Sequence, residues 1–197
     1  MKKLALFDFD GTLTTKDSLN EFLKYSVGIK TYFYKLICFS PIFLGYKLGI
    51  IPNDKAKQKL LKLFFKDWDE KKFRKVALDF STTNLKEILN HEIYNKLIDM
   101  KNDGYRIIII SASIECWLKP WCDLHEVELL ATKLKFENSK LTGELSTPNC
   151  YGKEKVNRLK KHLNINEYDE IVSFGDSKGD EYMFQISHIS HMVKKKV

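Results

Sequence analysis

Carboxylates and hydroxyls cluster at three places in the sequence, each directly after a short apolar run. Carboxylates can attack phosphorus, transfer protons and bind hard cations, and hydroxyls can hold phosphate oxygens. One such cluster could be a simple turn, because acids and glycine are common turn residues. Three of them in one chain are harder to attribute to chance. The clusters are Asp8 to Thr12, Ser111 to Ser113, and Gly175 to Asp180.

The apolar runs before these clusters have the length and composition of buried strands. They are Leu4 to Phe7, Arg106 to Ile110 and Ile171 to Phe174. Segments with helical spacing of apolar residues, around 93–100 and 156–163, separate the runs. Strands that alternate with helices predict an α/β fold with a parallel sheet. The carboxyl ends of parallel strands lie at one edge of the sheet, so the three clusters should meet there.

Three smaller elements complete the expected core. Alternating apolar residues on both sides of Glu137 to Lys140 predict a hairpin. The end of the chain should add a helix around 181–186 and a strand near 191–193.

The long segment 17–85 is expected to be a separate, all-helical domain. It follows the first strand and has almost no glycine after Gly49, and apolar residues such as Ala56, Leu60 and Phe64 recur at helical spacing. The α/β core would then comprise residues 1–16 and 86–197. Because the chain leaves the first strand at the predicted site, the insert should overhang it as a lid that excludes water.

These residues resemble the motifs of a known family. Asp8-Phe9-Asp10-Gly11-Thr12-Leu13-Thr14 resembles the first motif of the haloacid dehalogenase superfamily. Ser111, Lys153 and Gly175 to Asp180 resemble its second, third and fourth motifs, in the right order. The place of the helical insert is similar to that of the cap in the phosphoserine-phosphatase-like branch. The resemblance implies a Rossmann-like core with an inserted helical cap, and hydrolysis of a phosphate monoester.

The resemblance also implies a role for each motif residue. Asp8 would attack phosphorus to form an aspartyl-phosphate, and Asp10 would act as general acid and base. An acid at this second position favours phosphoester hydrolysis over dehalogenation. Mg²⁺ would be held by the side chains of Asp8 and Asp176 and by the backbone carbonyl of Asp10, and Lys153 would supply a fixed positive charge. The supporting residues would be Thr12, Ser111 and Ala112 at the phosphate, and Ser177 and Asp180 beside the lysine or the metal.

Each of these residues also has a simpler interpretation when it is taken alone. Ser111 could be a helix cap, Lys153 one of many surface lysines, and Asp176 and Asp180 further caps. Their joint occurrence favours the catalytic interpretation. A phosphotransferase, which passes the phosphate from Asp8 to an alcohol instead of water, stays open.

The identity of the substrate is less clear from the sequence. In phosphoserine phosphatases a Glu soon after the first motif binds the substrate amine, and a cap Arg binds its carboxylate. Asp17 occupies the comparable position here and Glu21 lies one helical turn further on, so both are candidates to touch substrate. Arg74 is the only cap arginine, and its surroundings do not resemble the serine-binding segment. We therefore expect the substrate to be either a lipid phosphate or a small phosphorylated metabolite that is not phosphoserine.

An apolar stretch from Tyr32 to Ile51 bears on that choice. Lys35 and Lys47 interrupt it, so it is too short for a membrane span of ~20 residues. We expect one or two buried helices, broken near Ser40-Pro41. The simpler interpretation is that its apolar side chains pack against one another. A substrate with an apolar tail would instead require this face to be open to the pocket or to solvent.

The overall charge narrows the partner only to an anion. The formal net charge is +7 and the pI about 9.0, which suits phosphorylated metabolites, acidic lipids or nucleic acid. No aromatic and basic motif supports nucleic-acid binding, so none is expected. An anionic-lipid-binding module with a vestigial site stays open, with at most peripheral membrane contact. Four scattered cysteines, and an acid as early as Asp8 that leaves no room for a signal peptide, predict a cytoplasmic protein.

Overall fold

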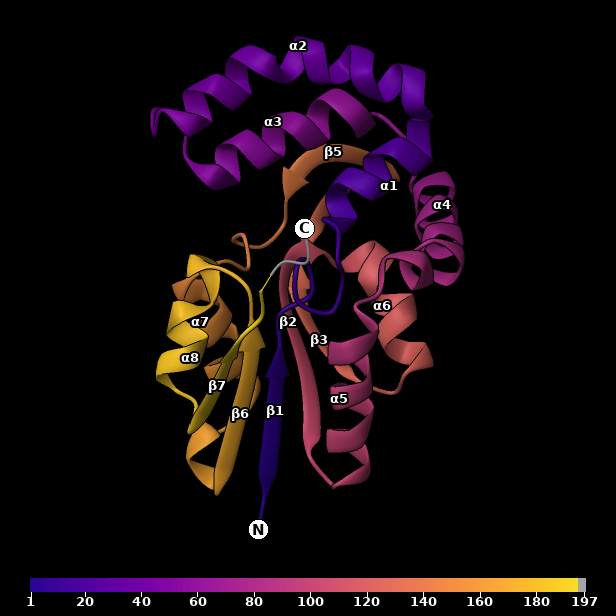
Figure 1. The fold of residues 1–197 in the computed structure, drawn as a ribbon. Coiled ribbons are helices and arrows are strands. Elements are labelled where there is room, and N and C mark those ends of the chain that lie inside the picture. Colours follow the sequence, from indigo (N-terminus) through magenta and orange to yellow (C-terminus); the bar gives the residue numbers. More distant parts are fainter. Residues whose placement is uncertain (195–197) are drawn as a thin grey trace.

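A five-stranded parallel sheet forms the centre of the computed structural model, which describes residues 1–194 (Figure 1). The strand order is β3-β2-β1-β6-β7, and each neighbouring pair is parallel. This confirms the predicted α/β class and the three predicted strands. The strands are β1 (Lys3–Phe7), β2 (Arg106–Ile114), β3 (Glu128–Thr132), β6 (Glu170–Gly175) and β7 (Ile189–Met192).

Helices cover both faces of this sheet. Alternate residues of β1 belong to different cores, because side chains of a strand point to opposite faces. Ala5 and Phe7 pack in the core on the side of α5 and α6, whereas Leu4 and Leu6 pack on the side of α7 and α8. The helices are α5 (His91–Asn102), α6 (Glu115–Leu124), α7 (Lys153–His162) and α8 (Glu181–Gln185), with short 3₁₀ turns η1 (Leu85–Ile88), η2 (Ile165–Glu167) and η3 (Lys178–Asp180).

A helical layer lies over the carboxyl ends of the strands (Figure 1). It consists of α1 (Ser18–Val27), α2 (Ile29–Lys47), α3 (Asn53–Phe65) and α4 (Glu70–Thr83). Phe22 of α1 is at the centre of an aromatic cluster, with rings of Phe65, Phe73, Phe80 and Trp117 within 5.5 Å of its own. Because Trp117 belongs to α6, this cluster also fixes the helical layer to the sheet core.

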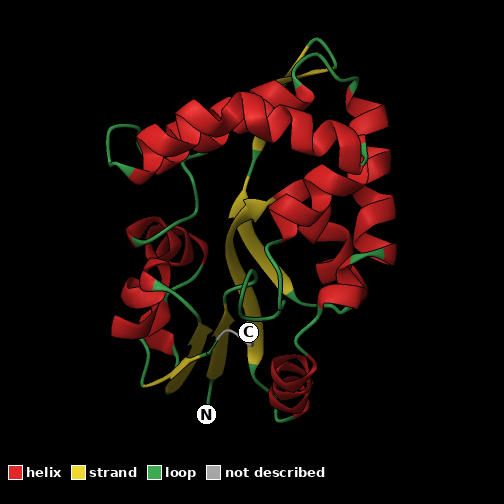
Figure 2. Ribbon diagram, turned by 45° about the horizontal axis from the view of Figure 1, so that its top comes forward, coloured by secondary structure: helices red, strands yellow, loops and turns green. Residues whose placement is uncertain are grey.

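The predicted hairpin is present and is part of the same layer. Strands β4 (Leu134–Glu137) and β5 (Lys140–Leu145) are antiparallel. Backbone hydrogen bonds of 2.9 Å join Leu141 to Asp67 and to Trp68, just after α3. At Gly143 the backbone comes so close to α3 that an added Cβ would lie 2.5 Å from the Cα of Lys62. Figure 2 shows the same helical layer above the ends of the strands in a second view.

The predicted break at Ser40-Pro41 is wrong. Helix α2 runs without interruption from Ile29 to Lys47, with Pro41 inside it. A proline lacks the N–H that would bond the carbonyl four residues earlier. In α2 the Ser40 hydroxyl donates instead to that carbonyl, the one of Ile37, at 2.7 Å. This local bond satisfies the carbonyl and allows the helix to continue.

The expectation that the apolar side chains of this helix pack against one another is also wrong. Of the residues of α2, only Tyr32 and Phe39 are buried. Several large apolar side chains on its other side are exposed, Ile37 by 72% of its surface. Within residues 1–194 no single helix is long and apolar enough to cross a membrane, and only α1 and α2 together, bent by 120°, reach that length and composition.

Candidate active site

The first catalytic candidate, Asp8, directly follows the central strand β1. Its backbone N–H donates to the Phe174 carbonyl of β6 at 2.9 Å, so the ends of the two strands are held side by side. Its side chain is buried, and one oxygen accepts a hydrogen bond from Thr12 at 3.4 Å. Asp8 therefore projects from the rigid centre of the sheet into the space below the helical layer.

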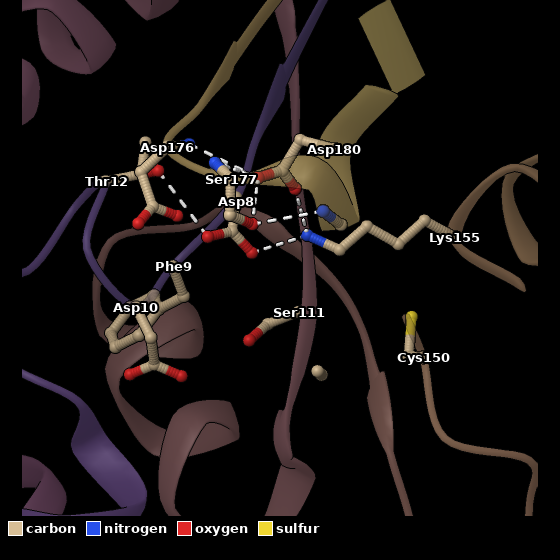
Figure 3. A network of polar contacts seen from close by, with 12 residues as sticks. Asp8, Phe9, Asp10, Thr12, Ser111, Cys150, Lys155, Asp176, Ser177 and Asp180 are labelled. Atoms are coloured by element: carbon tan, nitrogen blue, oxygen red, sulfur yellow. Dashed lines mark hydrogen bonds and ion pairs between the residues drawn. The ribbon is translucent and has the colours of Figure 1, made fainter. Parts of the chain in front are cut away.

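The ammonium of Lys155 lies between Asp8 and Asp180 (Figure 3). Its Nζ is 2.5 Å from Asp8 Oδ1 and 2.6 Å from Asp180 Oδ1. Burial alone would lower the pKa of Lys155, but the two carboxylates raise it above its ordinary value. Burial raises the pKa of Asp8 to about 7 in spite of this lysine. The lysine therefore stays charged and offsets part of the charge of the carboxylates.

The lysine at this position is not the one that the motif comparison suggested. Lys153 is the first residue of α7 and is exposed, whereas Lys155 is buried. Two residues along a helix correspond to a rotation of about 200°, so the two side chains leave on opposite sides. Only Lys155 faces the end of β1. The expectation for Lys153 is thus corrected to Lys155.

The loop after β6 is shaped around Asp180. One carboxylate oxygen of Asp180 bonds Lys155, and the other accepts hydrogen bonds from the Asp176 N–H, the Ser177 N–H and the Ser177 hydroxyl at 3.0–3.2 Å. Gly175 allows this arrangement, because a Cβ there would lie 2.6 Å from the Cβ of Asp180. Asp180 therefore positions both the lysine and the backbone that carries Asp176.

Three carboxylates converge at this point in a way that suits a divalent cation. Oxygen atoms of Asp8, Asp176 and Asp180 all lie within 4.8 Å of one another. The donors are all oxygens, the ligand type that Mg²⁺ and Ca²⁺ prefer. Three carboxylates beside a single buried lysine also leave excess negative charge. Asp180 accepts from Lys155 and from three donors of its own loop, so its carboxylate is already committed to holding the lysine and the loop in place.

Asp10 is held by the start of the helical layer. Asp10 Oδ1 accepts from the Ser18 N–H at 2.6 Å, in the first turn of α1, and its other oxygen accepts from the Ser113 hydroxyl near the end of β2. Its carboxylate points away from Lys155 (Figure 3). Burial, and then the charge of nearby Asp17, raise the pKa of Asp10 to about 6 although these hydrogen bonds oppose the shift. A carboxyl that titrates near neutrality can both give and take a proton.

A pocket of about 350 Å³ joins these groups to the helical layer. Of the expected phosphate-binding residues, Ser111 and Ala112 line it together with Ser177, and Thr12 is fully buried behind Asp8. Strand ends form its floor and α2 and α3 its opposite wall. The residues that line it include Asp8, Asp10, Asp176, Asp180, Lys155, Lys57, Asn149, Phe39, Phe43 and Tyr46.

Comparison with known proteins assigns this arrangement to a family. The sequence model of haloacid dehalogenase-like hydrolases matches residues 5–185. The chain belongs to the haloacid dehalogenase-like hydrolases. It is 27% identical to the protein CicA of Caulobacter vibrioides over 186 residues, which is 93% of this chain and 82% of CicA.

Solved structures resemble this hydrolase in fold. A protein of unknown function from Bordetella pertussis has a TM-score of 0.83 at 18% identity, over 96% of this chain and 89% of that one. A phosphoserine phosphatase with an analogue of its phospho-aspartyl intermediate has a TM-score of 0.68 at 22% identity, over 96% of this chain and 85% of that one. The fold is therefore that of the phosphoserine phosphatases.

Sequence reasoning missed one basic residue of the hydrolase's pocket. Lys57 belongs to the helical segment predicted around Ala56 and Leu60, and its ammonium reaches from α3 to the carbonyl of Ala112 and to Asn149 Oδ1. Burial lowers the pKa of Lys57 to about 8, although Asp10 and Asp17 oppose this. The sequence places Lys57 directly after Ala56, a predicted core residue of this helix. It does not show which of the several lysines of the helix turns inward.

The two expected substrate contacts are placed differently. Asp17 lines the pocket, where its side chain also caps α1 by accepting from the Asn20 N–H at 2.8 Å. Glu21 pairs with Lys24 at 2.7 Å and is not among the described residues that line the pocket. Arg74 pairs with Glu70 on the surface of α4 and lies outside the pocket lining as well. Only Asp17 remains a candidate substrate contact from this set.

Proposed function

We propose that this hydrolase is a Mg²⁺-dependent phosphatase that cleaves a phosphate monoester through an aspartyl-phosphate on Asp8. The observation that carries the proposal is the buried Asp8 beside a charged lysine and two further carboxylates. The resemblance in fold to phosphoserine phosphatases supports it. We also propose residues 17–85 as the cap, with the remainder as the catalytic core.

In the first half of the proposed reaction, a carboxylate oxygen of Asp8 attacks phosphorus while the bond to the leaving oxygen breaks. Asp10 gives its proton to that oxygen, so the product leaves as an alcohol. Lys155 and the Ser111 hydroxyl would hold charge on the phosphoryl oxygens. Mg²⁺, held by Asp8, Asp176 and the Asp10 carbonyl, would supply the positive charge that lets a carboxylate approach a dianion.

In the second half, water replaces the alcohol. Asp10 takes a proton from the water as its oxygen attacks phosphorus, and the bond between phosphorus and Asp8 breaks. Inorganic phosphate leaves, and Asp8 and the protonated Asp10 return to their starting states. The overlying helices would keep bulk water from the acyl phosphate until the alcohol has gone.

Phosphoserine is not the substrate that we propose. No arginine is among the described residues that line the pocket, so a carboxylate beside the phosphate would lack a bidentate partner there. Lys57 offers a single positive charge instead, and the wall formed by Phe39, Phe43 and Tyr46 is apolar. A phosphate monoester with an apolar portion fits this lining better than an amino acid does.

Four unpaired cysteines are consistent with a reducing, cytoplasmic setting.

The test is a panel of phosphate monoesters assayed for phosphate release with Mg²⁺, using Asp8→Asn as the control. The wild-type protein should release phosphate and Asp8→Asn should not, while both keep the same circular dichroism spectrum. Asp10→Asn should slow the reaction by ~10²–10⁴-fold. Phosphate release by pure Asp8→Asn at the wild-type rate would exclude the mechanism.

Transfer to an alcohol instead of water uses the same intermediate and is the second candidate. The apolar pocket wall supports this candidate, because it offers a surface on which an acceptor alcohol would bind. Adding an alcohol to the assay separates the two, because transfer would convert it to a new phosphate ester at the expense of free phosphate.

A further inference from the structure

Helix α2 exposes an apolar stripe along its whole length. Its inner side packs on α3 through Tyr32 and Phe39, and the Tyr32 ring lies 6.2 Å from that of Phe64. Its outer side faces away from the rest of the molecule, and Figure 1 shows α2 as the outermost element of the helical layer. Spacings of four and seven residues put the exposed side chains on one face. They are Ile29, Phe33, Ile37, Leu44 and Leu48, with Ile50 in the turn that follows.

The positive charge of the protein is concentrated in the segment that contains α2 and α3. Residues 28–66 contain eight lysines and a single acid, Asp54. The whole formal charge of +7 is therefore carried by this segment, and the rest of the chain is neutral. Lys30 and Lys47 stand in the first and last turns of α2, so basic groups bracket the apolar stripe at both ends.

We propose that this face of α2 docks on an anionic lipid bilayer. The apolar side chains would enter the boundary between headgroups and acyl chains, and Lys30 and Lys47 would meet the lipid phosphates. Exposed apolar patches of this kind usually mark an interaction site. A second copy of the chain is a poorer occupant, because two segments of the same high positive charge would face each other. Since its inner side is packed on α3, α2 would lie in the bilayer surface.

The docking face and the catalytic pocket share a wall. Phe39, Phe43 and Tyr46 of α2 line the pocket that holds Asp8, and Phe43 is also half exposed to solvent. The apolar wall thus continues from the catalytic carboxylate to the edge of the docking face. It follows, and this step rests on the proposed phosphatase function, that the substrate is a phosphate monoester borne on a lipid, with its headgroup at Asp8.

Sedimentation with vesicles tests the docking without any reaction. The wild-type protein should bind vesicles of phosphatidylglycerol and phosphatidylcholine, and binding should weaken with added salt and be much lower on phosphatidylcholine alone. The double variant Ile37→Glu/Leu44→Glu should bind at least tenfold more weakly, because each large side chain loses its burial. Leu124→Glu is the matched control, since Leu124 on α6 is 73% exposed and Ile37 is 72% exposed.

The outcomes separate the occupants of this face. Absence of binding to anionic vesicles, or equal binding by the double variant, would overturn the proposal. A dimer in lipid-free solution that Ile37→Glu/Leu44→Glu converts to a monomer would overturn it as well and assign the face to a second copy. Asp8→Asn should bind vesicles like the wild type, so docking can be supported even if the proposed chemistry is wrong.

Activity measurements then test the lipid substrate. The wild type should release phosphate from phosphatidic acid in vesicles. The double variant should lose at least tenfold of that rate but keep its rate on soluble p-nitrophenyl phosphate, because Ile37 and Leu44 lie outside the pocket. Equal loss on both substrates, or no hydrolysis of the lipid by a protein that hydrolyses the soluble ester, would overturn the lipid assignment. Inactivity on both would instead contradict the phosphatase function.

Discussion

The Nζ of Lys155 lies 2.6 Å from Asp180 Oδ1, and the two side chains are only 2% and 1% exposed. This buried pair holds the lysine against Asp8 and the loop after β6 against the sheet. Its geometry explains why a lysine on a basic helix is singled out for the site. The pair is the basis of the first prediction.

Lys155→Met should lower turnover by about 10²–10³-fold, as expected when one charge-stabilising donor is lost. It should also lower the free energy of unfolding by about 3–5 kcal/mol, because it leaves buried carboxylates without their partner. Steady-state kinetics and urea denaturation measure the two effects. Lys153→Met, two residues away on the exposed side, should change neither, and an equal effect of both variants would contradict the assignment.

Gly175→Ala should damage the site although it adds only a methyl group. The new Cβ would lie 2.6 Å from the Cβ of Asp180, so the Asp180 side chain or the strand end must move. We expect a loss of turnover of about tenfold or more, since misplaced catalytic groups are costly. Gly104→Ala is the control, because a Cβ there meets nothing within 4 Å, although its φ of +80° makes the change somewhat destabilising. Wild-type kinetics for Gly175→Ala would refute the packing argument.

Removal of the metal should abolish activity, and Mg²⁺ should restore it. Asp176→Asn should raise the half-saturating Mg²⁺ concentration more than Asp180→Asn does, because only Asp176 is proposed as a ligand. Asp180 acts through the loop, and such outer partners typically change metal affinity by about 10–100-fold. Titration of activity with Mg²⁺ after chelation gives both values. Full turnover in excess chelator would be the contrary result.

The pKa of Lys57, lowered to about 8 by burial, predicts a pH-dependent affinity for anionic substrates. The lysine is positive below that pH and neutral above it, so KM should rise as the pH increases through 8. Lys57→Met should raise KM about tenfold at pH 7, because a charged hydrogen-bond donor is lost, and it should remove this part of the pH profile. Lys55→Met changes an exposed lysine on the same helix and should keep the wild-type pH profile. A wild-type profile for Lys57→Met as well would contradict a role of Lys57 in binding.

The three central strands, β2, β1 and β6, could be predicted from the sequence because each contains a continuous apolar run. The end of each run also located acids, so Asp8, Asp10 and Asp176 can be proposed as site residues from the sequence alone. The choice between Lys153 and Lys155 could not be made in this way. It depends on where α7 begins and how it is rotated, and a shift of two residues turns a side chain to the opposite side of the helix.

The helical layer was harder to predict for a related reason. Apolar composition alone could not show that α2 has two different apolar faces, one packed on α3 and one exposed. Pro41 suggested a break, but the Ser40 hydroxyl satisfies the carbonyl that the proline leaves without a backbone partner. The inward turn of Lys57 likewise depends on how α3 packs over the strand ends, which is a tertiary property.

The contact of Gly143 with Lys62 has a consequence for how substrate and product exchange. The helical layer is linked to the sheet where the chain leaves and re-enters near Thr15 and Ile88, and again through the β4–β5 hairpin fixed beneath α3. The aromatic contact of Phe22 with Trp117 is a further attachment. A layer held at several separate places resists swinging about a single hinge and moves more easily by small sliding displacements. Exchange would then proceed through the mouth of the pocket beside α2. A bulky residue at position 143 should loosen the second tether and speed the release of product.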